Sequence, residues 1–411
     1  MQNLPSPAPE FVEAVNYFYT HHMRCQLVME LAPCAATCEV IATLRALGVG
    51  DAALLMRGRS ERSEARAEAQ VMRQIWITKF GPPEVLAIRQ APDPDPKPGE
   101  VRIRVEASGV NFADIVGRVG SYPDLPPIPV VPGYEVSGRI DAAGAGVDTS
   151  WVGRDVLAMT RFGGYADVIC VPVQQIFARP PSMSALEAAA LPINYFTAWQ
   201  LVVVMGGLKR GETVLVHSAG GGVGIAATQI ARHIGARVIG TASASKHAEL
   251  RALGVDHLID YRREDFEVRV REITNGRGVE LILDAIGGDS LRKGYRLLAP
   301  TGRLGMFGIS SAVTQKERRV LDMLGMLART PWFQFNPLSL ISANKGVFGV
   351  NLGHLWGEID RIRGWGEQLL DLWTQGAIKP KIARSFTFNE AADAHHFIQD
   401  RKNIGKVLLV P

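Results

Sequence analysis

Small residues dominate one short stretch of the sequence, AGGGVG at 219–224, and their spacing suits the binding of a dinucleotide. The stretch follows the pattern G-x-G-x-x-G with alanine in the first position. Each glycine removes a side chain that would block a tight turn, a pyrophosphate or the close packing of a helix. A helix beginning at Val223 would point free N–H groups and a partial positive charge at the phosphates. The alternative is a plain surface turn, because glycine clusters also occur there. The expected cofactor contacts are Ala219, Gly221, Gly222, Val223 and Gly224.

The loop TASASK at 241–246 indicates which dinucleotide binds. NAD sites usually carry an Asp or Glu about 20 residues past the glycines, where it binds the ribose 2′-hydroxyl. No acid is present in this loop, whereas the hydroxyls of Ser243 and Ser245 and the ammonium of Lys246 suit a 2′-phosphate. The loop therefore favours NADPH over NADH. The alternative is an ordinary solvated loop with Lys246 in water.

A β-turn-α-β unit must position the glycine stretch. Residues 213–219 and 237–241 are rich in β-branched residues and predict strands, and residues 225–234 repeat apolar residues at helical spacing. Strands and helices continue to alternate after Lys246, which is typical of a doubly wound, mostly parallel sheet, and the fold class is therefore α/β. The further strands are expected at 257–261, 279–285 and 303–309, and the further helices at 266–274 and 290–298.

The chain differs in character on either side of this unit. Residues 74–173 contain short strands and turns and predict a β-rich module. Residues 321–344 are a longer apolar and aromatic insertion. The remaining expected elements are helices at 184–191, 194–205, 356–374 and 390–400 and strands at 346–352, 381–388 and 406–410.

Length and composition narrow the class of protein. The 411 residues imply two or three domains, and 47% apolar with 21% charged residues allows a sizeable core. A net charge of +4 is small for this length and does not favour nucleic acid as the main partner. The four cysteines form no disulfide framework, which favours a reducing, cytoplasmic setting. No uncharged apolar run reaches the length of about 18 residues that a transmembrane segment needs.

Several motifs together resemble one family. SGVNFADIVGRVGSY (108–122), PVVPGYEVSGRI (129–140), VHSAGGGVG (216–224) and NIGKVLLVP (403–411) are similar to the zinc-independent quinone oxidoreductases related to zeta-crystallin, which belong to the medium-chain dehydrogenase/reductase superfamily. Within that group, residues 330–355 resemble homologues of the synaptic-vesicle amine-transport protein. The resemblance covers about residues 72–411 and does not reach residues 1–70.

The resemblance implies a domain organisation. It implies a GroES-like catalytic domain at 71–193 and 345–411 and a Rossmann NADPH-binding domain at 194–344, with residues 1–70 as an extension, and it suggests a homodimer.

The resemblance also implies site residues. Asn111 and Tyr122 would line the substrate pocket, with Asn111 donating its amide to the substrate oxygen, although Tyr122 alone is more often a packed aromatic. Arg118 would contribute positive potential or be a solvated charge. Many members of the family have a Tyr where this chain has Val116, so no tyrosine proton donor is expected there. The resemblance also implies cofactor contacts at Thr197, Tyr261, Phe307, Gly308 and Asn403. The alternatives without a cofactor are an ordinary helix threonine for Thr197, an aromatic that caps the core for Tyr261, and ordinary structural positions for the others.

No metal is expected in the site. Zinc alcohol dehydrogenases of this superfamily carry a Cys where this chain has Asn111 and a His where it has Tyr134, and neither replacement supplies a zinc ligand. Without a Lewis acid to polarise a carbonyl, simple alcohol and ketone chemistry is disfavoured. Quinones and enones suit such a site better, because hydride addition gives a resonance-stabilised anion that a few hydrogen-bond donors can hold.

The leading interpretation is thus an NADPH-dependent quinone or enone oxidoreductase that transfers hydride directly. Two alternatives stay open. One is a 2-alkenal or enoyl reductase on the same scaffold, because it needs the same cofactor geometry. The other is a cofactor-binding trafficking or interaction protein with little activity, which the resemblance to vesicle proteins allows.

Overall fold

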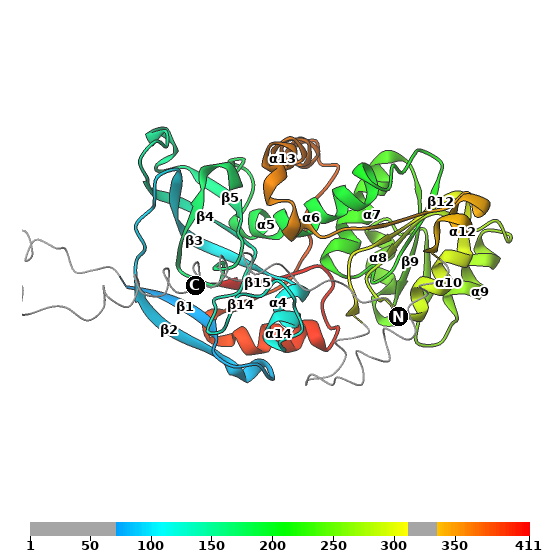
Figure 1. Ribbon diagram of the computed structural model, residues 1–411, viewed down its shortest axis with the longest axis horizontal. Coiled ribbons are helices and arrows are strands. Elements are labelled where there is room, and N and C mark those ends of the chain that lie inside the picture. The colour runs from blue at the N-terminus through cyan, green and yellow to red at the C-terminus, as the bar shows by residue number, and fades with distance from the viewer. Residues whose placement is uncertain (1–70, 311–334) are drawn as a thin grey trace, which may run out of the picture. The chain divides into compact units, whose positions relative to one another are not determined.

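The computed structural model describes residues 71–310 and 335–411 of the chain (Figure 1). Two groups of elements make up this part, a β-rich group and a parallel sheet covered by helices. The expectations for residues 1–70 and for most of the insertion at 321–344 lie outside the described residues. Within these two ranges, no helix is long and apolar enough to cross a membrane.

The β-rich group is built on a seven-stranded sheet in the order β14-β15-β3-β4-β5-β7, with β6 paired to β3. Buried and partly exposed residues alternate along the first half of β3, as expected of a strand with one face on a core. Because β14 and β15 come from the C-terminus, the end of the chain completes this sheet. The strands are β3 (Glu100–Val110), β4 (Glu135–Ala143), β5 (Asp155–Met159), β6 (Val168–Pro172), β7 (Ile176–Ala178), β14 (Ile382–Thr387) and β15 (Lys406–Val410), and β1 (Val71–Ile77) pairs with β2 (Leu86–Pro92) in a separate hairpin.

The second sheet has six strands, all parallel, in the order β10-β9-β8-β11-β12-β13. The chain moves outward from β8 to β10 and then returns to β11 on the other side of β8, so a crevice is expected beyond the carboxyl ends of β8 and β11. This sheet confirms the doubly wound α/β fold class. Its strands are β8 (Thr213–Val216), β9 (Arg237–Ala242), β10 (His257–Asp260), β11 (Val279–Asp284), β12 (Leu298–Met306) and β13 (Gly346–Gly349).

Helices cover both faces of the parallel sheet (Figure 1). Val214 and Val216 of β8 belong to the core on the face of α6 and α7, whereas Leu215 belongs to the core on the face of α9 and α10. This alternation follows from the two-residue period of a strand. The covering helices are α6 (Pro192–Trp199), α7 (Gly222–Ile234), α8 (His247–Ala252), α9 (Phe266–Ile273), α10 (Asp289–Leu297) and α12 (Pro337–Ala343), and a further helix, α13 (Ile359–Thr374), packs against α6.

One domain boundary differs from the expectation. Residue 345 was expected to begin the second part of the GroES-like domain, but β13 continues the parallel sheet, with Val347 opposite Leu304 of β12. The sheet therefore extends past residue 344. A helix boundary differs as well, because the helix expected over 194–205 begins at Pro192, ends at Trp199 and continues as a π-helical turn at Gln200–Val204.

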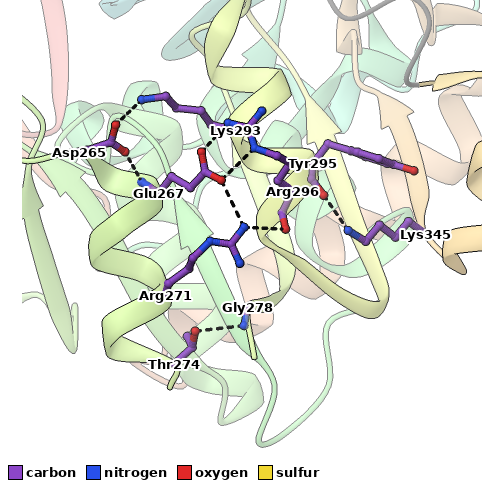
Figure 2. Close-up of polar contacts among 9 residues, drawn as sticks. All are labelled: Asp265, Glu267, Arg271, Thr274, Gly278, Lys293, Tyr295, Arg296 and Lys345. Carbon is purple, nitrogen blue, oxygen red and sulfur yellow. Dashed lines mark hydrogen bonds and ion pairs between the residues drawn. The ribbon is translucent and has the colours of Figure 1, made fainter. Parts of the chain in front are cut away.

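Ion pairs hold α9 against α10, two of the helices that border the site described below (Figure 2). Glu267 of α9 accepts from Arg296 of α10 and from Arg271 of its own helix, and Lys293 of α10 contacts Asp265 at 2.5 Å. These side chains are partly exposed, so each pair is worth about 0–1 kcal/mol. They link the two helices at the protein surface.

Candidate functional site

A cavity of about 810 Å³ lies beyond the carboxyl ends of β8, β9, β11 and β12, in the crevice expected from the strand order. Its opposite wall comes from the β-rich group. Asn111 occupies the N-cap position of α4 (Phe112–Arg118), Tyr134 immediately precedes β4, and Lys406 begins β15. One cavity therefore joins the glycine stretch to the residues expected to hold the substrate.

The glycine stretch turns from β8 into α7 where side chains would not fit. A Cβ on Gly224 would lie 2.5 Å from the carbonyl oxygen of Ser218, and one on Gly222 would overlap the amide of Asn194. The N-cap residue of α7 is Gly221, which has no side chain to cap the helix, so the first N–H groups of the helix are suited to an anion. The C-terminal segment meets this loop, because the Gly405 N–H donates to the Gly220 carbonyl at 2.9 Å.

Basic and hydroxyl groups gather at the end of β9. Ser243 and Lys246 line the cavity, and the Lys246 ammonium donates to the carbonyl oxygen of Asn403 at 2.5 Å. Arg401 donates to the Tyr261 hydroxyl at 3.3 Å and lies over its ring. Burial opposes ionisation of the Tyr261 phenol, but hydrogen bonds from Arg401 and Arg262 outweigh it, and its pKa lies below the usual value. This corner carries the positive charge that a 2′-phosphate requires.

Nearly all of the predicted site residues share this cavity. Ala219 does not line it, because it is fully buried under the loop, where its Cβ faces Gly240. Ser245 is exposed outside the lining and contacts it only through Ser243, with 3.2 Å between the two hydroxyl oxygens. The predicted residues that line the cavity are Asn111, Tyr122, Thr197, Gly221, Gly222, Val223, Gly224, Ser243, Lys246, Tyr261, Phe307, Gly308 and Asn403.

Aromatic side chains form the wall beside Asn111. The rings of Tyr122 and Tyr134 meet edge to face at 6.2 Å, and Phe162 packs on Tyr134 at 5.0 Å. Burial raises the pKa of the Tyr122 phenol, and the charge of Asp124 raises it further. Tyr122 is therefore a poor proton donor here. Met159, Val350, Leu352 and Trp356 complete a largely apolar surface.

The Asn111 side chain has two partners inside the protein. Its amide nitrogen donates to Glu135 Oε1 at 2.9 Å, and its carbonyl oxygen accepts from Lys406 Nζ at 2.7 Å. Sequence reasoning missed both partners. Lys406 lies in the closing motif NIGKVLLVP, but it is 295 residues from Asn111 along the chain, and no local pattern indicates the contact.

Arg118 fits neither of its two expected roles. Its side chain is fully buried and does not line the cavity. It donates to His395 Nδ1 at 3.2 Å and to Gln399 Oε1 at 2.7 Å, both on α14 (Ala391–Gln399), and to the Gly81 carbonyl. Burial lowers its pKa to about 10. Arg118 therefore fastens α4 to α14 behind the site.

Asp114 holds the backbone of Asn111 in place. Its buried carboxylate accepts from the backbone N–H groups of Asn111 at 2.8 Å and Gly133 at 3.0 Å and from the Tyr165 hydroxyl at 3.1 Å. Burial nevertheless raises its pKa from the ordinary 3.8 to about 7, although these bonds and the charge of Lys406 act in the opposite direction. The folded state thus holds this proton more tightly than the unfolded chain does.

Stability should depend on pH through this carboxyl. A raised folded-state pKa contributes stability that is complete below about pH 4 and is lost as the pH rises to about 7. We expect the contribution of Asp114 to the free energy of unfolding to fall across this window, and the corresponding slope to be absent in Asp114→Asn. Urea unfolding of both proteins at a series of pH values measures the difference. Parallel pH profiles would contradict the prediction.

The two positions that carry zinc ligands in related alcohol dehydrogenases hold Asn111 and Tyr134, which face the same cavity. Among residues 71–310 and 335–411, no group of three or more His, Cys, Asp or Glu side chains could hold a metal ion. The absence of zinc stays a prediction.

His217 is another cavity residue that sequence reasoning missed. Its Nδ1 lies 3.1 Å from the Thr241 hydroxyl, its ring meets Phe266 edge to face, and its buried Nε2 has no hydrogen-bond partner among the residues that the structure describes. Burial lowers its pKa, so the ring is neutral. An unpartnered buried nitrogen on the cavity wall is consistent with a polar ligand there.

Comparison with family models places two segments of the chain. Residues 97–181 match the alcohol dehydrogenase GroES-like domain, and residues 222–362 match the zinc-binding dehydrogenase family. The first match confirms that the β-rich group is GroES-like. The second ends beyond β13, in agreement with the extent of the parallel sheet.

Curated relatives are similar over most of the chain. The synaptic vesicle membrane protein VAT-1 homolog of Rattus norvegicus is 42% identical, over 84% of this chain and 85% of its own length. The 2-haloacrylate reductase of a Burkholderia species is 34% identical, over 82% of this chain and 98% of its own length.

Solved structures share the fold. A human VAT-1 homolog-like protein has 34% identity and a TM-score of 0.72, over 83% of this chain and 98% of that one. The mycobacterial protein Rv1454c in complex with NADPH has 31% identity and a TM-score of 0.71, over 83% and 100%. A quinone oxidoreductase of Pseudomonas syringae has 30% identity and a TM-score of 0.71, over 83% of this chain and 100% of that one.

Proposed function

The chain belongs to the medium-chain dehydrogenase/reductase superfamily of oxidoreductases, which confirms the resemblance found in its motifs, and from that premise we propose that it transfers hydride from NADPH to quinones or related enones. One observation carries the proposal. A single cavity is lined by the glycine-rich loop on one side and by Asn111 and its aromatic neighbours on the other. A dinucleotide and a flat apolar acceptor can therefore meet in one cavity.

The residues present fit NADPH. A side chain at Gly222 would meet the Asn194 amide, and one at Gly224 would meet the backbone of Ser218 and Ala219, so glycine at both positions lets α7 begin close to the end of β8, where its first N–H groups can reach the phosphates. Lys246, Arg401 and Ser243 would hold the 2′-phosphate, and no acid stands among them. When bound, the cofactor supplies the hydride. A structural relative was solved with NADPH, which supports the same choice for this chain.

The protein's own contribution is to position the acceptor and stabilise its charge. Aromatic walls would hold a flat ring, and Asn111 offers an amide N–H to the oxygen that becomes negative. Asn111 cannot give up a proton at neutral pH, and burial makes Tyr122 reluctant to do so. The proton that completes reduction therefore comes from solvent in this proposal.

Two alternatives have support of their own. A 2-alkenal or enoyl reductase is favoured by the similarity to the 2-haloacrylate reductase, because that name denotes reduction of an activated alkene. A cofactor-binding protein for trafficking or interaction is favoured by the similarity to the vesicle membrane proteins. Binding a dinucleotide does not require turning it over, so the cofactor site alone does not separate the three.

A substrate panel with NADPH separates them. We expect consumption with 1,2-naphthoquinone and little with 2-alkenals. Faster consumption with 2-alkenals would favour the alkene reductase. Tight NADPH binding without consumption by any acceptor would favour the binding protein.

Cofactor preference gives a second prediction. Lys246→Ala and Arg401→Ala should each weaken NADPH binding by about 1.5–3 kcal/mol, the range for a hydrogen bond to a charged group, and leave NADH binding little changed. Lys402→Ala is the matched control, because Lys402 adjoins Arg401 and pairs with Asp400 outside the cavity lining. Calorimetric titration of both cofactors measures the effect. Equal losses for NADPH and NADH would show that the two cations do not meet the 2′-phosphate.

The proposal includes a homodimer in the cytoplasm. The homodimer follows from the family resemblance, and the cytoplasmic setting from the absence of a disulfide framework. Light scattering of the purified full chain and fluorescence microscopy of a tagged copy test these two points.

A further inference from the structure

We propose that Lys406 is a positioning residue for the reaction, which together with Glu135 fixes the Asn111 amide so that one of its N–H groups faces the acceptor oxygen. The inference rests on the proposed function, because it assigns a role in hydride transfer to a carbonyl-type acceptor. It adds a residue from the opposite end of the chain to the site.

The three side chains form a closed set of contacts. Lys406 Nζ donates to Asn111 Oδ1 at 2.7 Å and also contacts Glu135 Oε1, and Asn111 Nδ2 donates to the same Glu135 oxygen at 2.9 Å. The other oxygen of Glu135 accepts from the Ile193 N–H at 2.6 Å. The carboxylate is thus held from both sides.

This arrangement allows only one orientation of the amide. If the Asn111 side chain turned over, its carbonyl oxygen would face the Glu135 carboxylate and its NH₂ group would face the Lys406 ammonium. Both new contacts would be repulsive. Because Glu135 occupies only one N–H of the NH₂ group, and because Asn111 lines the cavity, the second N–H is available to a ligand.

Burial makes the contacts strong and rigid. The Lys406 and Glu135 side chains are 3% and 0% exposed. Glu135 packs directly on Gly109, where any Cβ would overlap it. Lys406 and Asn111 line the cavity, whereas Glu135 lies behind them. The acceptor oxygen would therefore meet an N–H donor and a nearby ammonium, while the compensating carboxylate is kept away from it.

A double-mutant cycle tests whether Lys406 acts through Asn111. Lys406→Met should lower kcat with 1,2-naphthoquinone about 10²-fold, as misplacement of a reacting or positioning group does. In an Asn111→Ala background the same change should cost no more than about twofold, because the group that Lys406 orients is gone. The KM for NADPH should stay nearly constant throughout. Lys406→Arg, which keeps a cation with several donors, should regain most of the lost kcat.

Two controls separate positioning from folding. Lys406→Met leaves the buried Glu135 charge unpaired, so it is repeated together with Glu135→Gln, which removes that charge and keeps an acceptor for Asn111. The combined variant should show the same loss of kcat. Lys381→Met is the matched control, because Lys381 also forms a Lys–Glu pair, with Glu249, but does not line the cavity, and it should keep wild-type kcat.

A second readout needs no turnover. 4-Nitrophenol bound with NADP⁺ should ionise at a lower pH than free 4-nitrophenol in the wild type, because the positioned N–H and the ammonium favour the phenolate. Its absorbance titration should return toward the free value in Lys406→Met and in Asn111→Ala.

Three outcomes would overturn the inference. They are a Lys406→Met enzyme with unchanged kcat, a loss of the same size with and without Asn111, and an unshifted 4-nitrophenol titration in the wild type. Failure of the proposed function is distinct from these. If the wild type reduces no quinone or enone, the proposed function fails, and the 4-nitrophenol titration still decides whether Lys406 positions Asn111.

Discussion

Gly224→Ala is expected to weaken NADPH binding about tenfold or more and to lower the free energy of unfolding by about 1–3 kcal/mol, the usual cost of overpacking a buried site. The new Cβ would lie 2.5 Å from the Ser218 carbonyl oxygen and 2.8 Å from Ala219 Cα. Both are backbone atoms and cannot move aside alone. Either α7 must shift away from the strand or the loop must open, and a shift that costs about 1.4 kcal/mol of binding already gives a tenfold loss.

Gly364→Ala is the matched control for this prediction. Gly364 also lies within a helix, α13, but a Cβ there meets nothing within 4 Å. Gly364 is partly exposed, and alanine at a helix position with room for its Cβ is favoured over glycine by about 1 kcal/mol, so this variant should bind NADPH normally and be at least as stable as the wild type. Fluorescence titration with NADPH and urea unfolding measure the two properties. Normal NADPH affinity in Gly224→Ala would mean that the added methyl group is accommodated without displacing the loop or the start of α7.

The parallel sheet could be predicted from the sequence because its signals are local. Every residue of β11 is buried, and the strand carries the apolar run Leu281–Leu283, while the alternation of such runs with helices fixes the fold class. The family resemblance places β13 in the other domain, and no local signal corrects that boundary. The residues of β13 are only partly buried, and its pairing with β12 depends on a contact across the intervening insertion. Strand pairing of that kind leaves no trace in local periodicity.

Some residues of the candidate site could likewise be predicted from local sequence, whereas others could not. The glycine loop and the loop after β9 are short motifs with their own chemistry, so Gly222, Gly224 and Lys246 could be identified in advance. The partners of Asn111 could not, because tertiary contacts bring them together. Arg118 shows the limit most clearly. Its burial depends on His395 and Gln399, which are 277 and 281 residues away, and no local feature distinguishes it from a solvated arginine.

Asn111 and Tyr122 can be ranked by experiment. Both line the cavity near the expected acceptor, but they differ in what they can give it. The Tyr122 phenol is held protonated by burial and by Asp124, and an aromatic ring without the hydroxyl would still fill the wall. Tyr122→Phe should therefore keep most of kcat with a good quinone.

Asn111→Ala is expected to lower kcat with 1,2-naphthoquinone about 10²-fold, because it removes the one positioned N–H aimed at the oxygen where charge develops. The loss should fall on kcat and kcat/KM alike, since the hydrogen bond is strongest in the transition state. The Asn111→Ala change also removes the amide that contacts the buried Lys406–Glu135 pair. The free energy of unfolding is therefore measured together with the kinetics. The reverse ranking, with a nearly inactive Tyr122→Phe and an active Asn111→Ala, would make the tyrosine the proton donor. The site would then be better suited to reducing an activated alkene, whose α-carbon needs a proton after hydride arrives at the β-carbon, than to reducing a quinone.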